Sequence, residues 1–192
     1  MKLEITKRDE NECDFVLKGV STSFANAIRR SVMGKVPILA IDVVTFYENS
    51  SALFDEFIAN RLGLLPIITP EDYTEKDEVV FMLDKEGPCT VYSGDLKSTD
   101  KKVRCAYDNI PIIKLLEGQR LRLEAKARLG LGRKHAKFQP ALISYSYDEK
   151  NETYQFHAES FGNMPIEKVI MRAVDILEKK CDSFIKEVEE IA

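Results

Sequence analysis

The segment GRKHAKFQP, residues 132–140, concentrates the side chains with the widest choice of chemistry in this 192-residue chain. It contains three cations, a histidine, an aromatic ring and a proline, at Arg133, Lys134, His135, Lys137, Phe138 and Pro140. Cations beside a ring can bind phosphates and stack on nucleic-acid bases. The same set can also fill a pocket of a protein partner, because arginine forms charged hydrogen bonds and proline fixes the backbone.

A longer cationic stretch leads into this segment. Between positions 120 and 137 there is one acid, Glu124, and there are seven cations, at Arg120, Arg122, Lys126, Arg128, Arg133, Lys134 and Lys137. A solvated strand face followed by a loop accounts for such a stretch. Phosphate binding with Phe138 as a stacking platform and docking to a protein account for it as well. The residues alone leave these three interpretations open.

Residues suited to catalysis at neutral pH are scarce. Strand alternation places His157 on the polar side of its strand, and His135 has no acid nearby in the sequence to orient it. No GxSxG, Walker, HExxH or GxGxxG motif is present, and LGLG at 129–132 has too few glycines for a phosphate-binding loop. We therefore expect no catalytic residues in this chain and no activity carried by it alone.

The four cysteines do not form a metal-binding pattern. Cys13, Cys89, Cys105 and Cys181 stand far apart, without a CxxC or CxxxC pair among them. Most metal and iron–sulfur sites draw on such close pairs, because several ligands must converge on one ion. We expect reduced thiols, no metal ion and no other cofactor.

The overall composition favours a globular protein with a local binding surface. Apolar residues make up 44% of the chain and the formal net charge is −4, so any contact with nucleic acid would have to be local. No stretch approaches the roughly 20 apolar residues that a membrane span needs. We expect a cytoplasmic chain without a membrane partner.

Hydrophobic periodicity predicts an α+β fold. Alternation at Leu3, Ile5, Cys13, Phe15 and Leu17 indicates a hairpin around Asp9 to Asn11. One helix is predicted at about 22–34, and a second in ALFDEFIANRLGLLPI, with Asp55 and Glu56 in its opening turn and its end at Gly63. Strands are predicted in the segments from Pro37, EVVFML, PCTVYSGDL, 120–129, ALISYSYD and TYQFHAESFG. The strand at 120–129 has the cleanest alternation, with an apolar face and a cationic face.

The last predicted helix has an apolar face along its whole length. From Pro165 to the C-terminus, apolar side chains recur at three- and four-residue steps, at Ile166, Val169, Ile170, Ala173, Val174, Leu177, Cys181, Phe184, Ile185, Val188 and Ile191. At about 1.5 Å per residue the helix is roughly 40 Å long, whereas a body of this size has a radius of gyration near 16 Å. The helix either bends back over its own sheet or pairs with another chain, and the near-heptad spacing does not decide between them.

Three segments carry a resemblance to a known family. They are TSFANAIRRSVMGKVPILAIDVV (22–44), DEFIANRLGLLPI (55–67) and GRKHAKFQPA (132–141). They resemble the signature stretches of the family that holds the D polypeptide of archaeal DNA-directed RNA polymerase, the third-largest subunit of eukaryotic polymerase II and, more distantly, the bacterial polymerase α N-terminal domain. The resemblance extends from near the N-terminus to the last helix.

The resemblance implies a discontinuous dimerisation domain with an inserted domain. The dimerisation domain, a sheet with two helices of which one is long and C-terminal, is expected at 1–47 and 152–192. The inserted, mainly-β domain is expected at 48–151. Some archaeal members carry an iron–sulfur insertion between the last two strands, but here only Asp148 to Glu152 separate them. The chain is therefore expected to lack that insertion.

The resemblance also implies partners and contact residues. It predicts a heterodimer with polymerase subunit L, to which small zinc-binding subunits and then the second-largest and largest subunits attach. The residues expected at the dimer interface or in the core beneath it are Phe24, Ala27, Ile28, Ile170, Leu177 and Phe184. Those expected to dock the large subunits are Arg29, Arg30, Arg133, Lys134, His135, Lys137, Phe138 and Pro140.

The preferred hypothesis is therefore a non-catalytic assembly subunit of a DNA-directed RNA polymerase. Such a subunit supports transcription within a nucleotidyltransferase complex without contacting nucleic acid itself. The alternative is a nucleic-acid-binding module that uses the cationic stretch at 120–137.

Overall fold

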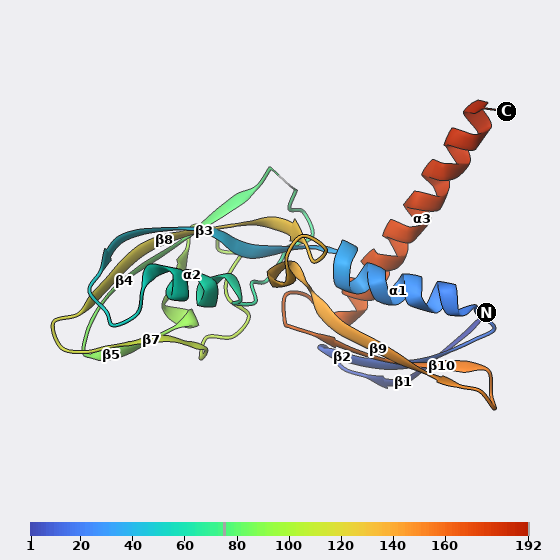
Figure 1. The fold of residues 1–192 in the computed structure, drawn as a ribbon, viewed down its shortest axis with the longest axis horizontal. Helices are drawn as coiled ribbons and strands as arrows, with labels where there is room; N and C mark the ends of the chain where they lie inside the picture. The colour runs from blue at the N-terminus through green and yellow to red at the C-terminus, as the bar shows by residue number, and fades with distance from the viewer. Residues whose placement is uncertain (75, 192) are drawn as a thin grey trace. The chain divides into compact units, whose positions relative to one another are not determined.

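The computed structural model describes residues 1–74 and 76–191 and divides into two compact units. Unit 1 combines Met1–Pro37 with Leu131–Ala192, and unit 2 is Ile38–Gly130 (Figure 1). These borders differ from those expected after residue 47 and before residue 152. Most of the strand that starts at Pro37 belongs to unit 2, and the strand at Ala141–Asp148 belongs to unit 1 because it pairs along its whole length with its neighbour there.

Unit 1 is an antiparallel sheet with two helices. Its elements are β1 (Lys2–Arg8), β2 (Glu12–Lys18), α1 (Thr22–Lys35), β9 (Ala141–Asp148), β10 (Thr153–Ser160) and α3 (Ile166–Ile191). The strand order is β1-β2-β10-β9, so the N-terminal and C-terminal segments of the chain meet where β2 pairs with β10. This pairing makes unit 1 one folded body although its two segments are far apart in the sequence.

Short polar side chains define the ends of these elements. The Asp9 carboxylate accepts backbone hydrogen bonds from Asn11 (3.1 Å) and Glu12 (2.8 Å) and thereby closes the β1–β2 turn. Ser21 Oγ accepts from the backbone N–H of Phe24 at 3.3 Å and caps α1. The Asp148 carboxylate accepts from the backbone N–H of Lys150 at 2.9 Å in the β9–β10 turn.

Both helices of unit 1 cover one face of the sheet (Figure 1). Phe15 and Phe156 are paired across β2 and β10, and their rings stack with centroids 4.7 Å apart. Tyr154 and Ala158 are buried on the same face, whereas His157 lies on the opposite, solvent-exposed face. The predicted exposure of His157 is thus confirmed.

Unit 2 consists of two sheets around one apolar core. Its elements are β3 (Pro37–Asn49), α2 (Asp55–Gly63), β4 (Glu78–Glu86), β5 (Cys89–Tyr92), β6 (Lys97–Ser98), β7 (Pro111–Leu115) and β8 (Arg120–Leu131). The larger sheet has the order β3-β8-β4-β6, and β5 pairs with β7. The inward side chains of β8, from Leu121 to Ala127, are buried in the core, and α2 adds Ile58 and Leu62.

The predicted α+β class is confirmed, and both internal helices end within one residue of the expected position. The segment PCTVYSGDL, predicted as one strand, is not continuous. A 3₁₀ turn at Ser93–Asp95 separates β5 from β6, because the Asp95 carboxylate accepts the backbone N–H of Tyr92 at 2.8 Å. None of the helices in the described chain is both long enough and apolar enough to cross a membrane.

The stacked phenylalanine pair should dominate the stability of unit 1. We expect Phe156→Ala to lower the free energy of unfolding by about 3–5 kcal/mol, because the cavity would lie beneath both helices. Leu142→Ala is the matched control, since Leu142 lies on β9 and is 48% exposed; it should change that free energy by less than about 0.5 kcal/mol. Urea unfolding of the full chain measures both, and equal losses would contradict this view of the core.

Candidate functional site

A groove in unit 1 brings together two of the sequence segments singled out above. It has a volume of about 640 Å³ and lies between the C-terminal half of α1 and the loop that follows β8. The residues that line it are Ala27, Arg29, Arg30, Met33, Gly34, Lys35, Gly132, Arg133 and Gln139. Arginines that are about 100 positions apart in the sequence therefore border one groove.

Close backbone contact holds the loop against α1. The backbone N–H of Arg133 donates to the carbonyl oxygen of Gly34 at 3.2 Å. A Cβ atom on Gly132 would lie 2.0 Å from the carbonyl oxygen of Met33, so only glycine fits there without a backbone shift. Gly132 in the GRKHAKFQP segment thus allows the backbone of the loop to lie close to the backbone of α1.

Internal hydrogen bonds order the rest of the loop. The Lys134 backbone N–H donates to the Leu131 carbonyl at 2.8 Å, and His135 Nδ1 accepts from the Lys137 backbone N–H at 3.1 Å. This second bond caps a 3₁₀ turn at Ala136–Phe138. His135 is exposed, and its side chain also stabilises the conformation of the loop.

The predicted docking residues differ in their exposure to solvent. Arg30, Arg133, Lys134 and His135 are exposed, and Arg29 and Lys137 are half-buried. Phe138 is 5% exposed and Pro140 is also buried. The ring and the proline therefore hold the loop in place, while the cations and the histidine stay available at the surface.

The positive charges that line the groove have no carboxylate counterion among the described residues. Arg29 is held by the side-chain oxygen of Asn26, at 3.2 Å from Nε and 3.0 Å from Nη2. Within residues 1–74 and 76–191, no carboxylate forms an ion pair with Arg29, Arg30, Lys35 or Arg133. Burial lowers the pKa of Lys35, and the nearby cations Lys180, Arg30 and Arg133 lower it further.

The cationic face of β8 is different, because neighbouring strands neutralise it. Arg120 forms a two-pronged contact with Asp84 on β4, at 3.0 and 2.9 Å, and Arg128 pairs with Asp42 on β3 at 2.5 Å. Arg122 also approaches Asp84, at 4.0 Å. For Arg120, Arg122 and Arg128 the count along the sequence is misleading, since their acidic partners lie on other strands.

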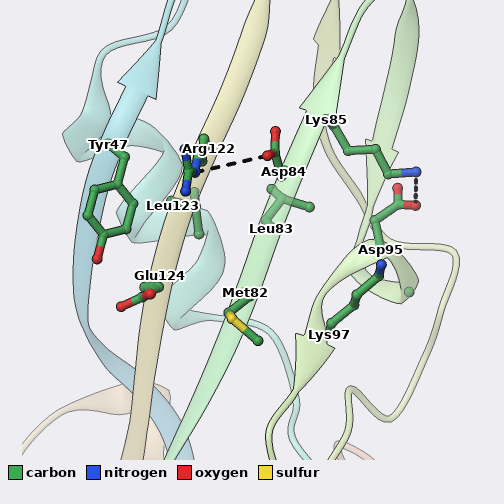
Figure 2. A pocket seen from close by; sticks show the side chains of 11 residues that line it. Tyr47, Met82, Leu83, Asp84, Lys85, Asp95, Lys97, Arg122, Leu123 and Glu124 are labelled. Carbon is green, nitrogen blue, oxygen red and sulfur yellow. Dashed lines mark ion pairs between the residues drawn. The ribbon is translucent and has the colours of Figure 1, made fainter.

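A hollow of about 800 Å³ over this part of unit 2 is likewise lined by both acidic and basic side chains. Figure 2 shows the Arg122–Asp84 pair and, beside it, Lys85 paired with Asp95 at 2.7 Å. The Arg122 guanidinium also lies 5.7 Å from the centre of the Tyr47 ring. A surface with both signs interleaved does not attract a phosphate backbone, so the structure gives the nucleic-acid alternative no support on β8.

The long helix α3 is covered only near its start. Ile166, Val169 and Ala173 are buried, and Ile170 and Leu177 are half-buried. From position 178 to 191 every residue is exposed. The helix does not bend back over its own sheet, and Figure 1 shows its C-terminal half extending beyond the rest of unit 1.

Apolar side chains remain on this uncovered half. Phe184 is 68% exposed, and the others are Ile185, Val188 and Ile191. Cys181 lies in the same exposed part, unlike Cys13 and Cys105, which are buried. Of the interface residues expected on α1, Phe24 is 40% exposed, Ala27 is half-buried and Ile28 is buried in the core.

A second apolar surface, which sequence reasoning missed, lies beside the start of α3. Leu3 and Ile5 on the edge strand β1 face the same side as the core residues of β2 but remain about half exposed. With Ile170 and Met171 they line a groove of about 260 Å³. The alternation of β1 predicts which face of the sheet these side chains lie on. Only the three-dimensional structure shows that β1 is an edge strand and that the helices do not cover it.

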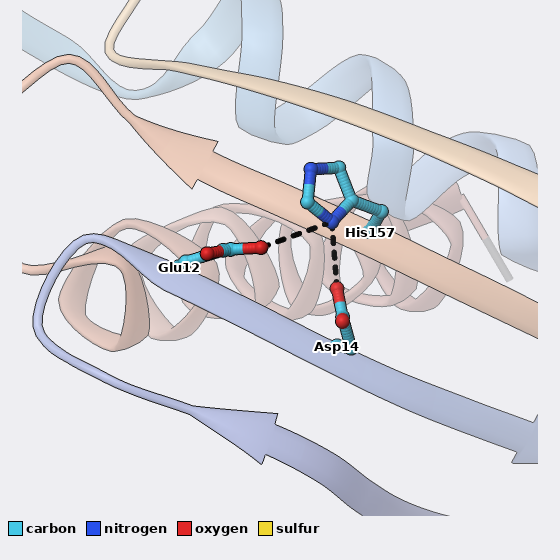
Figure 3. A group of neighbouring side chains, drawn as sticks. All are labelled: Glu12, Asp14 and His157. Carbon is cyan, nitrogen blue, oxygen red and sulfur yellow. Dashed lines mark hydrogen bonds and ion pairs between the residues drawn. The ribbon is translucent and has the colours of Figure 1, made fainter.

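Glu12, Asp14 and His157 are the only group with metal-ligand spacing in the part of the chain that the structure describes. His157 Nδ1 lies 2.6 Å from Asp14 Oδ1 and 3.8 Å from Glu12 Oε1 (Figure 3). The Lys7 ammonium already pairs with Glu12 at 2.6 Å. His157 and Asp14 are direct partners across β10 and β2, so a cross-strand polar network explains the cluster.

Comparisons with known proteins agree on one family. The family model for the RNA polymerase Rpb3/RpoA insert domain matches residues 32–144. DNA-directed RNA polymerase subunit Rpo3 of Pyrococcus furiosus is 38% identical, with 100% of this chain and 98% of the relative covered. The Rpo3 subunit of Methanocaldococcus jannaschii is 47% identical, with 88% and 86% covered, and that of Halobacterium salinarum is 38% identical, with 97% of each chain covered.

The alignment with the Pyrococcus furiosus relative is longer than this chain. It extends over 256 positions, compared with 192 residues here. That relative therefore contains residues without a counterpart in this chain.

Two glycine substitutions test the contact between the loop and α1. We expect Gly132→Ala to lower the free energy of unfolding by about 1–3 kcal/mol, because its methyl group would meet the Met33 carbonyl. Gly34→Ala is the matched control: its Cβ would approach nothing closer than 3.8 Å, and within α1 alanine should stabilise by up to about 1 kcal/mol. Denaturant unfolding measures both, and a neutral Gly132→Ala would contradict the close approach.

Proposed function

Because the chain belongs to the family of DNA-directed RNA polymerase subunit Rpo3, we propose that it is a non-catalytic assembly subunit of that enzyme, acting in the cytoplasm. Its immediate partner is a second small subunit, the polymerase subunit L. The resulting pair then receives the small zinc-binding subunits, followed by the second-largest and largest subunits.

The uncovered half of α3 is the observation that carries this proposal. All fourteen residues from 178 to 191 are exposed, and a helical segment of this length gains little stability in water without a packed apolar face, since isolated helices shorter than about 12–15 residues are marginal. Leu177, Cys181, Phe184, Val188 and Ile191 continue the stripe that is buried near the start of the helix. An apolar stripe of this length, exposed in the isolated chain, fits a partner chain that packs along it.

The site chemistry supports a role in assembly and not in catalysis. The His157 cluster is a cross-strand network, and His135 caps a turn in its own loop. Burial raises the pKa of the Cys105 thiol to about 11 and also raises that of Cys13, so neither is an activated nucleophile. In the second proposed surface, the loop at 132–140 contacts the second-largest subunit, and Arg29 and Arg30 contribute to contacts with the large subunits.

We also infer that this subunit lacks an iron–sulfur cluster. β9 ends at Asp148 and β10 begins at Thr153, and a tight turn fixed by the Asp148 carboxylate joins them. The four cysteines lie on separate elements, two of them buried. Elemental analysis of the purified chain should show no bound iron, and stoichiometric iron with sulfide would contradict the inference.

Co-expression with subunit L tests the proposal as a whole. The expected result is a stable one-to-one complex by mass measurement, whereas the chain alone should self-associate through its apolar helix face. A chain that stays monomeric and does not bind subunit L would contradict it.

A charge on the helix face tests which surface is used. Phe184→Glu should weaken the complex with subunit L at least about tenfold, because a carboxylate would be buried in an apolar interface. Leu142→Glu is the matched control, since it places the same charge at another exposed apolar position, on β9. Binding titrations with labelled subunit L measure the difference, and equal affinities of the two variants would show that another surface makes the contact.

A further inference from the structure

The groove between α1 and the loop at 132–140 has a chemistry that the assembly role alone does not specify. Three of its cations, Arg29, Arg30 and Lys35, come from α1, and Arg133 comes from the loop. Lys180 on α3 adds a further positive charge close to Lys35. We propose that this groove binds an acidic segment of a protein partner, which presents at least two carboxylates to Arg30, Lys35 and Arg133.

Charge complementarity is the first argument for a carboxylate ligand. These cations form no ion pair with a carboxylate of the described chain, in contrast to Arg120 and Arg128 of unit 2, which both do. Burial lowers the pKa of Lys35 most, and the nearby cations Lys180, Arg30 and Arg133 lower it further, so like charges lie close together in the groove. A bound carboxylate relieves the repulsion between these cations, and no carboxylate of the described residues does so.

Preorganisation is the second argument. The Asn26 side chain holds the Arg29 guanidinium, and the bond from the Arg133 backbone to Gly34 fixes the start of the loop. At Gly132 the loop also comes close to the backbone of Met33 on the other wall of the groove. Arginine on a fixed backbone suits carboxylates because its planar group can donate two parallel hydrogen bonds.

The shape and lining of the groove favour a protein segment over a nucleic acid. Its cations converge on one hollow, whereas contact with a duplex requires cations spread along the phosphate backbone. Ala27, Met33 and Gln139 supply apolar and amide surface between the charges, and no aromatic ring for base stacking lines the groove. Such a mixture suits a peptide with acidic and apolar side chains.

This inference rests on the proposed function, because the acidic segment would belong to one of the large polymerase subunits, bound beside the loop. The test therefore starts from the purified complex of the chain with subunit L and measures binding of the two large subunits over a range of salt concentrations. The double variant Arg30→Gln with Arg133→Gln removes two groove charges. The double variant Lys126→Gln with Lys150→Gln makes the same charge change on β8 and in the β9–β10 turn.

The groove variant should bind the large subunits at least about tenfold more weakly than the wild type and with a shallower salt dependence, while the control variant should match the wild type. Arg30→Lys with Arg133→Lys should bind more tightly than the glutamine variant and less tightly than the wild type, because the charge is kept while the two parallel hydrogen bonds of arginine are lost. A decaglutamate peptide should bind the wild-type pair and not the groove variant.

Three other outcomes have distinct meanings. Equal binding of the large subunits by the groove variant and the wild type would overturn the inference and leave the proposed function intact. Failure of the wild-type pair to bind them at all would overturn both. Salt-sensitive binding of a duplex DNA that is lost in the groove variant, with decaglutamate inert, would overturn the inference in favour of a nucleic-acid ligand.

Discussion

The structure depends on one constraint, which is that unit 1 can bury only the first half of its own terminal helix. Ile166, Val169 and Ala173 are buried, α3 packs against α1 and the sheet, and every residue from 178 to 191 is exposed. The hydrophobic stripe nevertheless continues to Ile191. Apolar area exposed to water costs about 25 cal/mol per Å², so the exposed stripe is unfavourable in the isolated chain. A partner that covers this stripe stabilises the helix and the complex together.

The same unit joins two surfaces of opposite chemistry through α1. One surface is the apolar face around α3, and the other is the cationic groove beside Gly132 and Arg133. α1 packs against α3 and also forms a wall of the groove. An apolar face suits a permanent partner, whereas fixed charges suit a contact that must select its partner and orient it. An assembly subunit needs both kinds of contact.

Much of the fold could be predicted from the sequence, because the decisive signals were local. The alternation at 120–129 and the N-cap before α1 depend only on neighbouring residues. The groove could not be predicted in this way, since Arg30 and Arg133 meet only after β2 has paired with β10. Counting charges along β8 failed for the same reason, because Asp42 and Asp84 lie on other strands. Periodicity likewise did not show whether α3 bends back over its own sheet. That depends on how far unit 1 extends, and unit 1 leaves residues 178–191 exposed.

Amide hydrogen exchange of residues 178–191 tests the central claim most directly. In the dilute chain alone these amides should exchange quickly, because every residue in that half of α3 is exposed. Once subunit L is bound they should exchange at least about a hundredfold more slowly, while amides around Val169 should change little. Exchange at 178–191 that is already slow in the monomer, or that is unchanged by subunit L, would contradict the account.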